Sequence, residues 1–229
     1  MATDRRRLLQ SALALAAAPV RTASAQAPRQ RALMKVGTQH VPTSGPKAAD
    51  GLKLMSALGI HHICGSEPSM TPGPEWSVES LTKVRERVES YGIKLEMLPL
   101  PLSSVPLASS PYKATLLGKS PDRDREIDSL CEMIRNTGRA GIPALKYNFT
   151  VLGWIRSEST PGRAGAMYST LQLAKAKDDG PIAEIGVMDA DRKWETITYF
   201  LKRVIPVAAE YKVKMRSEER RVGKECRSR

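Results

Sequence analysis

Three histidines, His40, His61 and His62, lie near the ends of the first two apolar segments of this sequence. Imidazole donates and accepts protons near neutral pH and hydrogen-bonds hydroxyl groups. Side chains alternate between the two faces of a strand, so only one of His61 and His62 can point to a given side. We expect these histidines to contact a substrate, and the alternative is that each is structural or solvated.

A second polar group follows the fourth apolar segment, where Tyr147 and Asn148 are followed closely by Trp154 and Arg156. The Asn side chain both donates and accepts hydrogen bonds, and the Arg fork matches a carboxylate. This set would bind a polyhydroxy acid. The alternative places Tyr147 in the core, uses Trp154 to anchor a loop and leaves Arg156 in solvent.

Short apolar runs alternate with helical patterns along the chain. Strands are predicted at 33–39, 60–64, 93–100, 142–149 and 212–215. Helices are predicted at 47–58, 77–91, 120–140 and 190–211, and a loop of forty residues precedes the last one. Repeated βα units imply parallel strands with right-handed crossovers.

The helical stretches carry caps and apolar stripes that indicate which face is buried. Ser77 and Ser120-Pro121 are expected to cap two helices. Apolar residues recur at spacings of three and four, which marks the side that faces a core. The three stripes are Val78, Leu81, Val84 and Val88; Ile127, Leu130, Cys131 and Ile134; and Trp194, Ile197, Leu201, Val204 and Ile205.

Two folds are built from such repeated βα units, a doubly wound sheet and a (β/α)8 TIM barrel. No G-x-G-x-x-G motif or P-loop is present, so the nucleotide-binding sheet has no support. We expect an α/β fold of the TIM-barrel type, truncated to about the first four and a half βα units. Active sites of such barrels lie at the carboxyl ends of the strands.

The formal net charge of +12 over 229 residues is concentrated at the two ends. Residues 1–25 contain four arginines and one aspartate, and residues 216–229 contain six basic and three acidic residues. The two ends therefore hold half of the excess. The mild remaining charge suits a small anionic substrate and argues against a nucleic-acid partner.

Both ends also have unusual sequence patterns. Residues 1–25 combine Arg5-Arg6-Arg7, a short apolar run and an A-x-A site at Ala23-Ser24-Ala25, which predicts a twin-arginine export signal and a periplasmic protein outside the membrane. The alternative is an amphipathic N-terminal helix. Residues 216–229 resemble a translated sequencing adapter, which leaves 26–215 as the partial barrel.

Metal ligands and nucleophilic sets are not recognisable between residues 26 and 215. Cys64 and Cys131 fall in a predicted strand and on a predicted helix face, where buried free thiols are expected. No His, Cys or Asp cluster has metal-ligand spacing, and no Ser/His/Asp set is found. The residues alone therefore leave the catalytic groups unassigned.

Several longer motifs occur in a characteristic order. They include MKVGTQH, LGIHHIC, EWSVESLTKVRERVESYGIKLEMLPL, CEMIRNTGRAGIPALKYNF, GWIRSESTPGR and FLKRVIPVAAEYKVKM. Across residues 33–215 the chain resembles the mannonate dehydratase family. The resemblance implies a barrel similar to xylose isomerase that dehydrates D-mannonate to 2-dehydro-3-deoxy-D-gluconate in hexuronate (glucuronate) breakdown.

The resemblance also implies a cofactor, a cellular setting and competing functions. Family members use Mn²⁺ or Fe²⁺ and are usually cytoplasmic, and the resemblance places the metal ligands and the catalytic residues beyond Met215. A homo-oligomer is also expected to be compatible with the family. One alternative is a sugar isomerase or epimerase of the same barrel class. Another is that this chain is catalytically inert because its barrel is incomplete.

Overall fold

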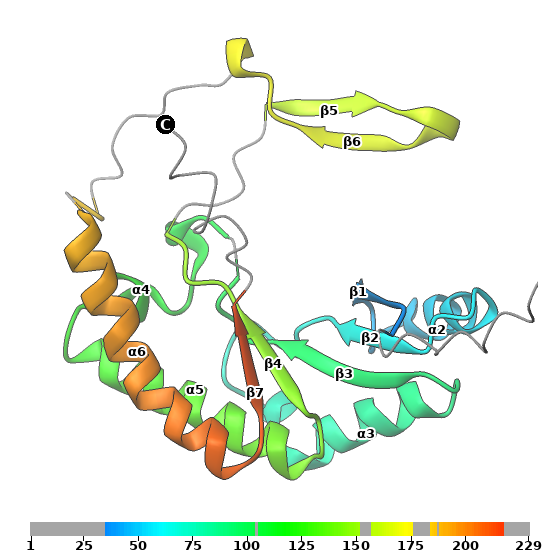
Figure 1. The fold of residues 1–229 in the computed structure, drawn as a ribbon, viewed down its shortest axis with the longest axis horizontal. Coiled ribbons are helices and arrows are strands. Elements are labelled where there is room, and N and C mark those ends of the chain that lie inside the picture. Colours follow the sequence, from blue (N-terminus) through cyan, green and yellow to red (C-terminus); the bar gives the residue numbers. More distant parts are fainter. Residues whose placement is uncertain (1–34, 104, 152–156, 176–183, 187, 218–229) are drawn as a thin grey trace, which may run out of the picture. The chain divides into compact units, whose positions relative to one another are not determined.

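The computed structural model describes residues 35–217 except 104, 152–156, 176–183 and 187. The elements below belong to the compact unit Val36–Arg229. In its described part a parallel sheet has the strand order β1-β2-β3-β4-β7 (Figure 1). These strands are β1 Gly37–Val41, β2 His62–Gly65, β3 Lys94–Pro99, β4 Ala144–Tyr147 and β7 Lys214–Ser217. Sequential parallel pairing confirms the predicted βα repeat.

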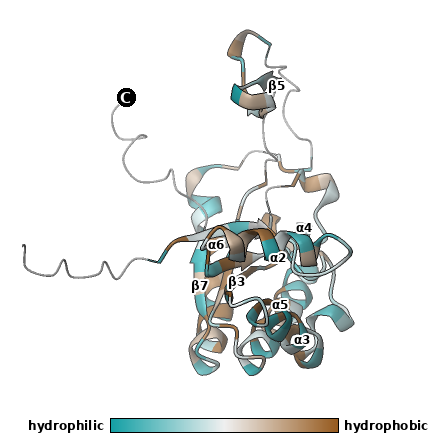
Figure 2. Ribbon diagram, turned by 90° about the vertical axis from the view of Figure 1, so that its right-hand side faces the viewer, coloured by the Kyte–Doolittle hydropathy of each residue, from teal (hydrophilic) through white to brown (hydrophobic). Residues whose placement is uncertain are grey.

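Helices connect the strands and cover one side of the sheet, as Figure 1 shows for α3, α5 and α6. The helices are α2 Ala48–Ala57, α3 Val78–Glu89, α4 Lys113–Leu117, α5 Asp122–Arg139 and α6 Ala190–Glu210. Leu98 and Leu145, in register on β3 and β4, are buried in the core. In Figure 2 hydrophobic residues concentrate where the helices meet the strands.

The α3 segment follows its sequence pattern. Ser77 is the N-cap, and its Oγ accepts a hydrogen bond from the Ser80 backbone N–H at 3.2 Å. Leu81 and Val88 are fully buried, so the predicted stripe is confirmed. Gly92 has φ +72°, a left-handed conformation that favours glycine and turns the chain into β3.

The cap predicted for α5 is wrong, although its buried stripe is confirmed. The N-cap is Pro121, with no side-chain cap hydrogen bond, and the Ser120 hydroxyl donates to the Asp124 carboxylate instead. Because the helix begins at Asp122, Ser120 lies one residue too early to cap its free amides. Ile127, Leu130, Cys131 and Ile134 are all buried.

The buried face of α6 matches the predicted one only in part: Val204 is buried and Ile197 and Leu201 pack against the core, but the two ends of the predicted stripe are exposed. Trp194 is 59% exposed and Ile205 43% exposed. The buried residues recur every four positions at Thr196, Phe200, Val204 and Ala208. Thr196 and Ala208 are too weakly apolar to mark a stripe, but their small side chains permit close packing, and a Cβ on Gly118 would lie 2.9 Å from Thr196 Oγ1.

Strand boundaries are shifted at the start of the sheet. β1 begins at Gly37, so His40 is part of the strand rather than after it. Gly59 has φ +72°, and the Ile60 N–H donates to the Met55 carbonyl, so the chain is still turning at Ile60. β2 therefore begins at His62, two residues later than predicted.

The segment between β4 and α6 is more ordered than a simple loop. It contains an antiparallel hairpin of β5 Glu158–Pro161 and β6 Met167–Thr170, which corrects the predicted loop. The predicted site residues Trp154 and Arg156 lie outside the described residues, as do the predicted export signal and residues 218–229. No helix in the described part is long and apolar enough to cross a membrane.

Candidate functional site

Two irregularities in strand register lie on either side of β2. Between β1 and β2 the pairing passes from Thr38↔Ile63 to Val41↔Gly65, so β1 uses one residue more than β2. Between β2 and β3 it passes from Ile63↔Leu95 to Cys64↔Met97, so Glu96 is the extra residue. Such bulges redirect side chains and occur often beside functional sites.

The second bulge brings Glu96 of β3 to His62 of β2. His62 Nδ1 lies 2.7 Å from Glu96 Oε1, and the two side chains are 23% and 33% exposed. A carboxylate accepts, so the ring donates from Nδ1 and presents Nε2 as its second polar atom. A partner of this kind fixes both the tautomer and the orientation of an imidazole.

Lys146 of β4 reaches the other bulge. Its Nζ donates to Gln39 Oε1 of β1 at 3.3 Å, and the Lys146 side chain is buried at 5% exposure. Because β2 and β3 lie between β1 and β4, this hydrogen bond spans the inner face of the sheet. Of the buried polar residues in the described ranges, Lys146 alone carries a charge.

Alternation along the strands separates this inner face from the core. Ile63, next to His62, is 1% exposed in the hydrophobic core. Leu145 and Tyr147, on either side of Lys146, belong to the same core. Neighbouring strand residues point to opposite faces, so His62 and Lys146 lie on the face away from the helices.

A pocket of about 340 Å³ opens on this inner face. Its lining combines a ring nitrogen, a carboxylate, an amide, a hydroxyl and a half-buried thiol, a set suited to hydrogen-bonding a polyhydroxy ligand. The lining residues are Gly37, Thr38, Gln39, His62, Ile63, Cys64, Glu96 and Met97.

His61 and His62 lie at the amino end of β2 rather than near its carboxyl end, which corrects their expected placement. His61 precedes β2 and is exposed, and its Nδ1 lies 3.1 Å from the Gly92 carbonyl in the turn before β3. Of the pair, His62 lines the inner-face pocket, whereas His61 does not. His40 is in β1 by its backbone, and its side chain is not among those described.

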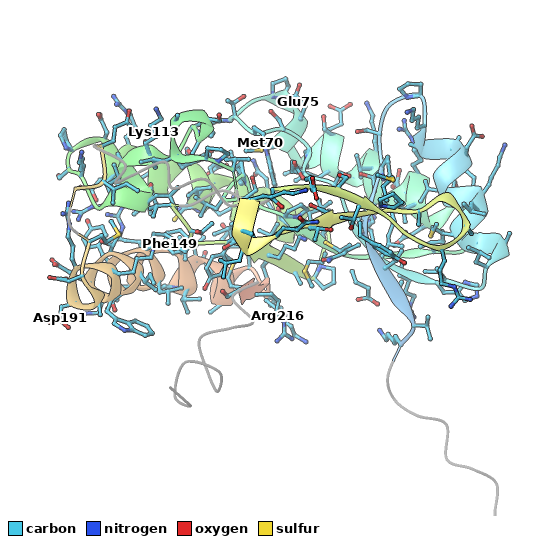
Figure 3. The ribbon with its side chains drawn as sticks, turned by 90° about the horizontal axis from the view of Figure 1, so that it is seen from above. Met70, Glu75, Lys113, Phe149, Asp191 and Arg216 are labelled. Carbon is cyan, nitrogen blue, oxygen red and sulfur yellow. The ribbon has the colours of Figure 1, made fainter. Side chains whose placement is uncertain are left out.

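Tyr147 is the last residue of β4 and Asn148 follows it, and the two lie in different environments. Tyr147 is buried, and its ring centroid lies 5.5 Å from that of Phe200 on α6. It thus occupies the core, as the structural alternative held. Asn148 is half-buried, and its backbone N–H donates to the Leu102 carbonyl at 2.7 Å. Figure 3 shows the next residue, Phe149, beside α6, where its ring lies 5.1 Å from Phe200.

Sequence reasoning missed Gln39, Glu96 and Lys146. The available signal was a charge inside an apolar strand: Glu96 interrupts IKLEMLPL and Lys146 interrupts IPALKYNF. Burying a charge costs free energy unless it is compensated, so such interruptions mark candidate functional positions. Gln39 carried no such signal, because its placement depends on the bulge.

The described residues do not fit a divalent metal centre. No group of three or more His, Cys, Asp or Glu side chains among them is arranged to hold a metal ion. His62 and Glu96 supply only two candidate donors, and these are hydrogen-bonded to each other. We therefore assign no step to a metal within this part of the chain.

Comparison with known proteins identifies the family. Residues 44–185 match the family model described as D-mannonate dehydratase (UxuA). A mannonate dehydratase of Streptococcus agalactiae serotype Ia is 30% identical over 167 residues, covering 62% of this chain and 45% of that protein. One from Thermotoga petrophila is 26% identical over 189 residues, covering 69% of this chain and 50% of that protein.

A solved structure extends the match to the fold. The crystal structure of mannonate dehydratase from Streptococcus suis serotype 2 superposes with a TM-score of 0.63 and 26% identity, covering 80% of this chain and 51% of that one. The chain spans about half the length of the curated relatives it matches, and its fold is the corresponding part of a TIM barrel. The chain belongs to the D-mannonate dehydratase (UxuA) family.

Proposed function

We propose that this chain is part of a hydro-lyase that converts D-mannonate to 2-dehydro-3-deoxy-D-gluconate. The observation that carries the proposal is the family match over residues 44–185, which includes β2, β3 and β4. The reaction removes the proton from the carbon next to the carboxylate and the hydroxyl group from the following carbon. The resulting enol tautomerises to the 2-keto acid.

The inner face supplies groups that suit the substrate side of this reaction. His62, oriented by Glu96, presents Nε2 toward hydroxyl groups, and the Gln39 amide both donates and accepts. A rigid set of this kind holds the reacting carbons in one orientation, which is a large part of catalysis. The group that removes the proton is proposed to lie beyond Met215.

The family resemblance implies Mn²⁺ or Fe²⁺ as cofactor. We propose that its ligands also lie beyond Met215, because the described residues contain no suitable cluster. A bound cation would stabilise the negative charge that develops when the proton leaves. Every contact assigned above is made by side chains of this chain and does not depend on that cation.

The test compares the 229-residue chain with the product of the natural gene, in which we propose that a longer continuation takes the place of the adapter-like residues 216–229. Each is incubated with D-mannonate, with and without Mn²⁺, and the 2-keto-3-deoxy product is quantified. We expect the longer chain to form product only with metal, and the 229-residue chain to form none. Conversion of a neutral ketohexose, without dehydration of mannonate, would support the epimerase alternative instead.

A further inference from the structure

Lys146 lies where parallel sheets bind ligands. It is the third residue of β4, near the carboxyl end of the strand, and its side chain is on the inner face. In TIM barrels ligands bind at the carboxyl ends of the strands. The position therefore combines a buried positive charge with the end of the sheet where a substrate is expected.

The contact of Lys146 connects it to the pocket. Its Nζ donates to Gln39 Oε1, and Gln39 lines the pocket of about 340 Å³ and is exposed. The lysine stem is flexible, so Nζ can exchange one oxygen acceptor for another nearby. A carboxylate oxygen is a stronger acceptor than a neutral amide oxygen, because its hydrogen bond with an ammonium group is charge-assisted.

The positive and negative side chains near the pocket lie on different strands. Lys146 contributes a positive charge through β4, whereas Glu96 contributes a carboxylate from β3 that is bonded to His62. A ligand carboxylate is attracted to Lys146 and repelled by Glu96, while hydroxyl groups can bond with His62 and Gln39. Attraction at one end and repulsion at the other produce specificity for one orientation.

We propose that Lys146 binds the carboxylate of a sugar acid and thereby selects acids over neutral sugars of the same length. The identity of the acid as D-mannonate rests on the proposed function, whereas selection for a carboxylate rests on Lys146 itself. Gln39 and the His62–Glu96 pair then bind the hydroxyl groups. Lys146 is a specificity-determining residue in this arrangement.

The experiment measures dissociation constants of the purified 229-residue chain for D-mannonate and for D-mannitol by calorimetry. D-mannitol has the same carbon skeleton with a hydroxymethyl group in place of the carboxylate. The wild-type chain is expected to bind the acid more tightly. Lys146→Met, similar in length but uncharged, is expected to weaken D-mannonate binding by about tenfold to a hundredfold and to leave D-mannitol binding unchanged.

Two further variants control for charge and folding. Lys214→Met removes an exposed lysine from the neighbouring strand β7 and is expected to leave both constants unchanged. Lys146→Arg keeps the positive charge and is expected to retain the preference for the acid, and circular dichroism checks the fold of each variant. The proposal is overturned if Lys146→Met weakens the binding of D-mannonate and D-mannitol equally. It is also overturned if the wild-type chain does not bind the acid more tightly than the alcohol.

A third ligand separates this inference from the proposed function. D-gluconate differs from D-mannonate only in configuration at the carbon next to the carboxylate. If the chain binds D-gluconate through Lys146 but does not bind D-mannonate, the role of Lys146 is supported and D-mannonate is rejected as the substrate. Dehydration of D-mannonate by the natural gene product with an unchanged KM in Lys146→Met would retain the function and reject the role of Lys146.

Discussion

At the scale of single residues, the inner face is organised by pairs rather than by isolated side chains. Glu96 orients His62, and Gln39 accepts from Lys146, with partners that are 34 and 107 positions apart in the sequence. Each pair joins two strands, so the sheet must form before either contact exists. The sequence alone could suggest a role for His62, but it could not show that Glu96 orients the imidazole ring.

The His62–Glu96 contact predicts a measurable coupling in stability. In a double-mutant cycle of His62→Ala and Glu96→Ala, we expect a coupling free energy of about 0.5–1.5 kcal/mol, typical of a half-buried hydrogen bond. Urea unfolding of the four chains measures it. The same cycle for His61 and Glu96 is the control, because His61 bonds with the Gly92 carbonyl instead. A coupling of zero for His62 would show that the pair does not persist in solution.

At the scale of secondary-structure elements, the helices show where sequence patterns succeed. The stripes of α3 and α5 were predictable because strongly apolar residues mark a face through local periodicity alone. The face of α6 was predictable only in part, because Thr196 and Ala208 are buried by close packing against other elements. The bulges that expose Glu96 and Gln39 were also inaccessible, since register depends on the neighbouring strand.

The corrected face of α6 gives a stability prediction. Phe200 is fully buried and contacts the rings of Tyr147 and Phe149. Phe200→Ala is expected to lower the free energy of unfolding by about 3–5 kcal/mol, because it leaves a cavity in the core. Trp194→Ala, at a position 59% exposed, is expected to change it by less than about 0.5 kcal/mol. Denaturant unfolding measures both, and a larger effect for Trp194 would restore the face predicted from sequence.

A hydrogen bond between α5 and α6 predicts that the stability of the fold depends on pH. The Tyr199 hydroxyl donates to Asp124, and this hydrogen bond, with the nearby Arg123 guanidinium, holds the pKa of Asp124 below its ordinary value. A carboxyl group with a lowered pKa in the folded state stabilises the fold above the unfolded pKa of about 3.9, and this contribution is lost as pH falls through the folded pKa. Acidification below about pH 4 is therefore expected to lower Tm.

Tyr199→Phe tests that linkage. The variant keeps the ring and removes the hydroxyl, so its Tm is expected to fall less steeply than that of the wild-type chain between pH 4 and pH 2. Tyr168→Phe changes an exposed tyrosine of the β5–β6 hairpin and is expected to leave the slope unchanged. Calorimetric scans at several pH values compare the three chains. Identical slopes would mean that the Tyr199 hydroxyl does not contribute to the lowered pKa of Asp124.

At the scale of the whole molecule, the parallel sheet and its inner face describe one part of a larger barrel. The relatives that match are about twice as long as the matched region, and the solved structure is covered to 51%. In a complete barrel the inner faces of all strands converge on one interior. On the proposed function, the polar groups on β1 to β4 would line one side of that interior.

The predicted export signal is tested on the whole chain in a bacterial host. We expect cleavage after Ala25, a mature chain beginning at Gln26 and recovery from the periplasm, because the twin-arginine route carries folded proteins past the membrane. Arg5→Lys combined with Arg6→Lys is expected to leave the uncleaved precursor in the cytoplasm, whereas Arg21→Lys alone is expected to have no effect. Fractionation and intact-mass measurement distinguish these outcomes. An uncleaved wild-type chain in the cytoplasm would favour the amphipathic-helix alternative.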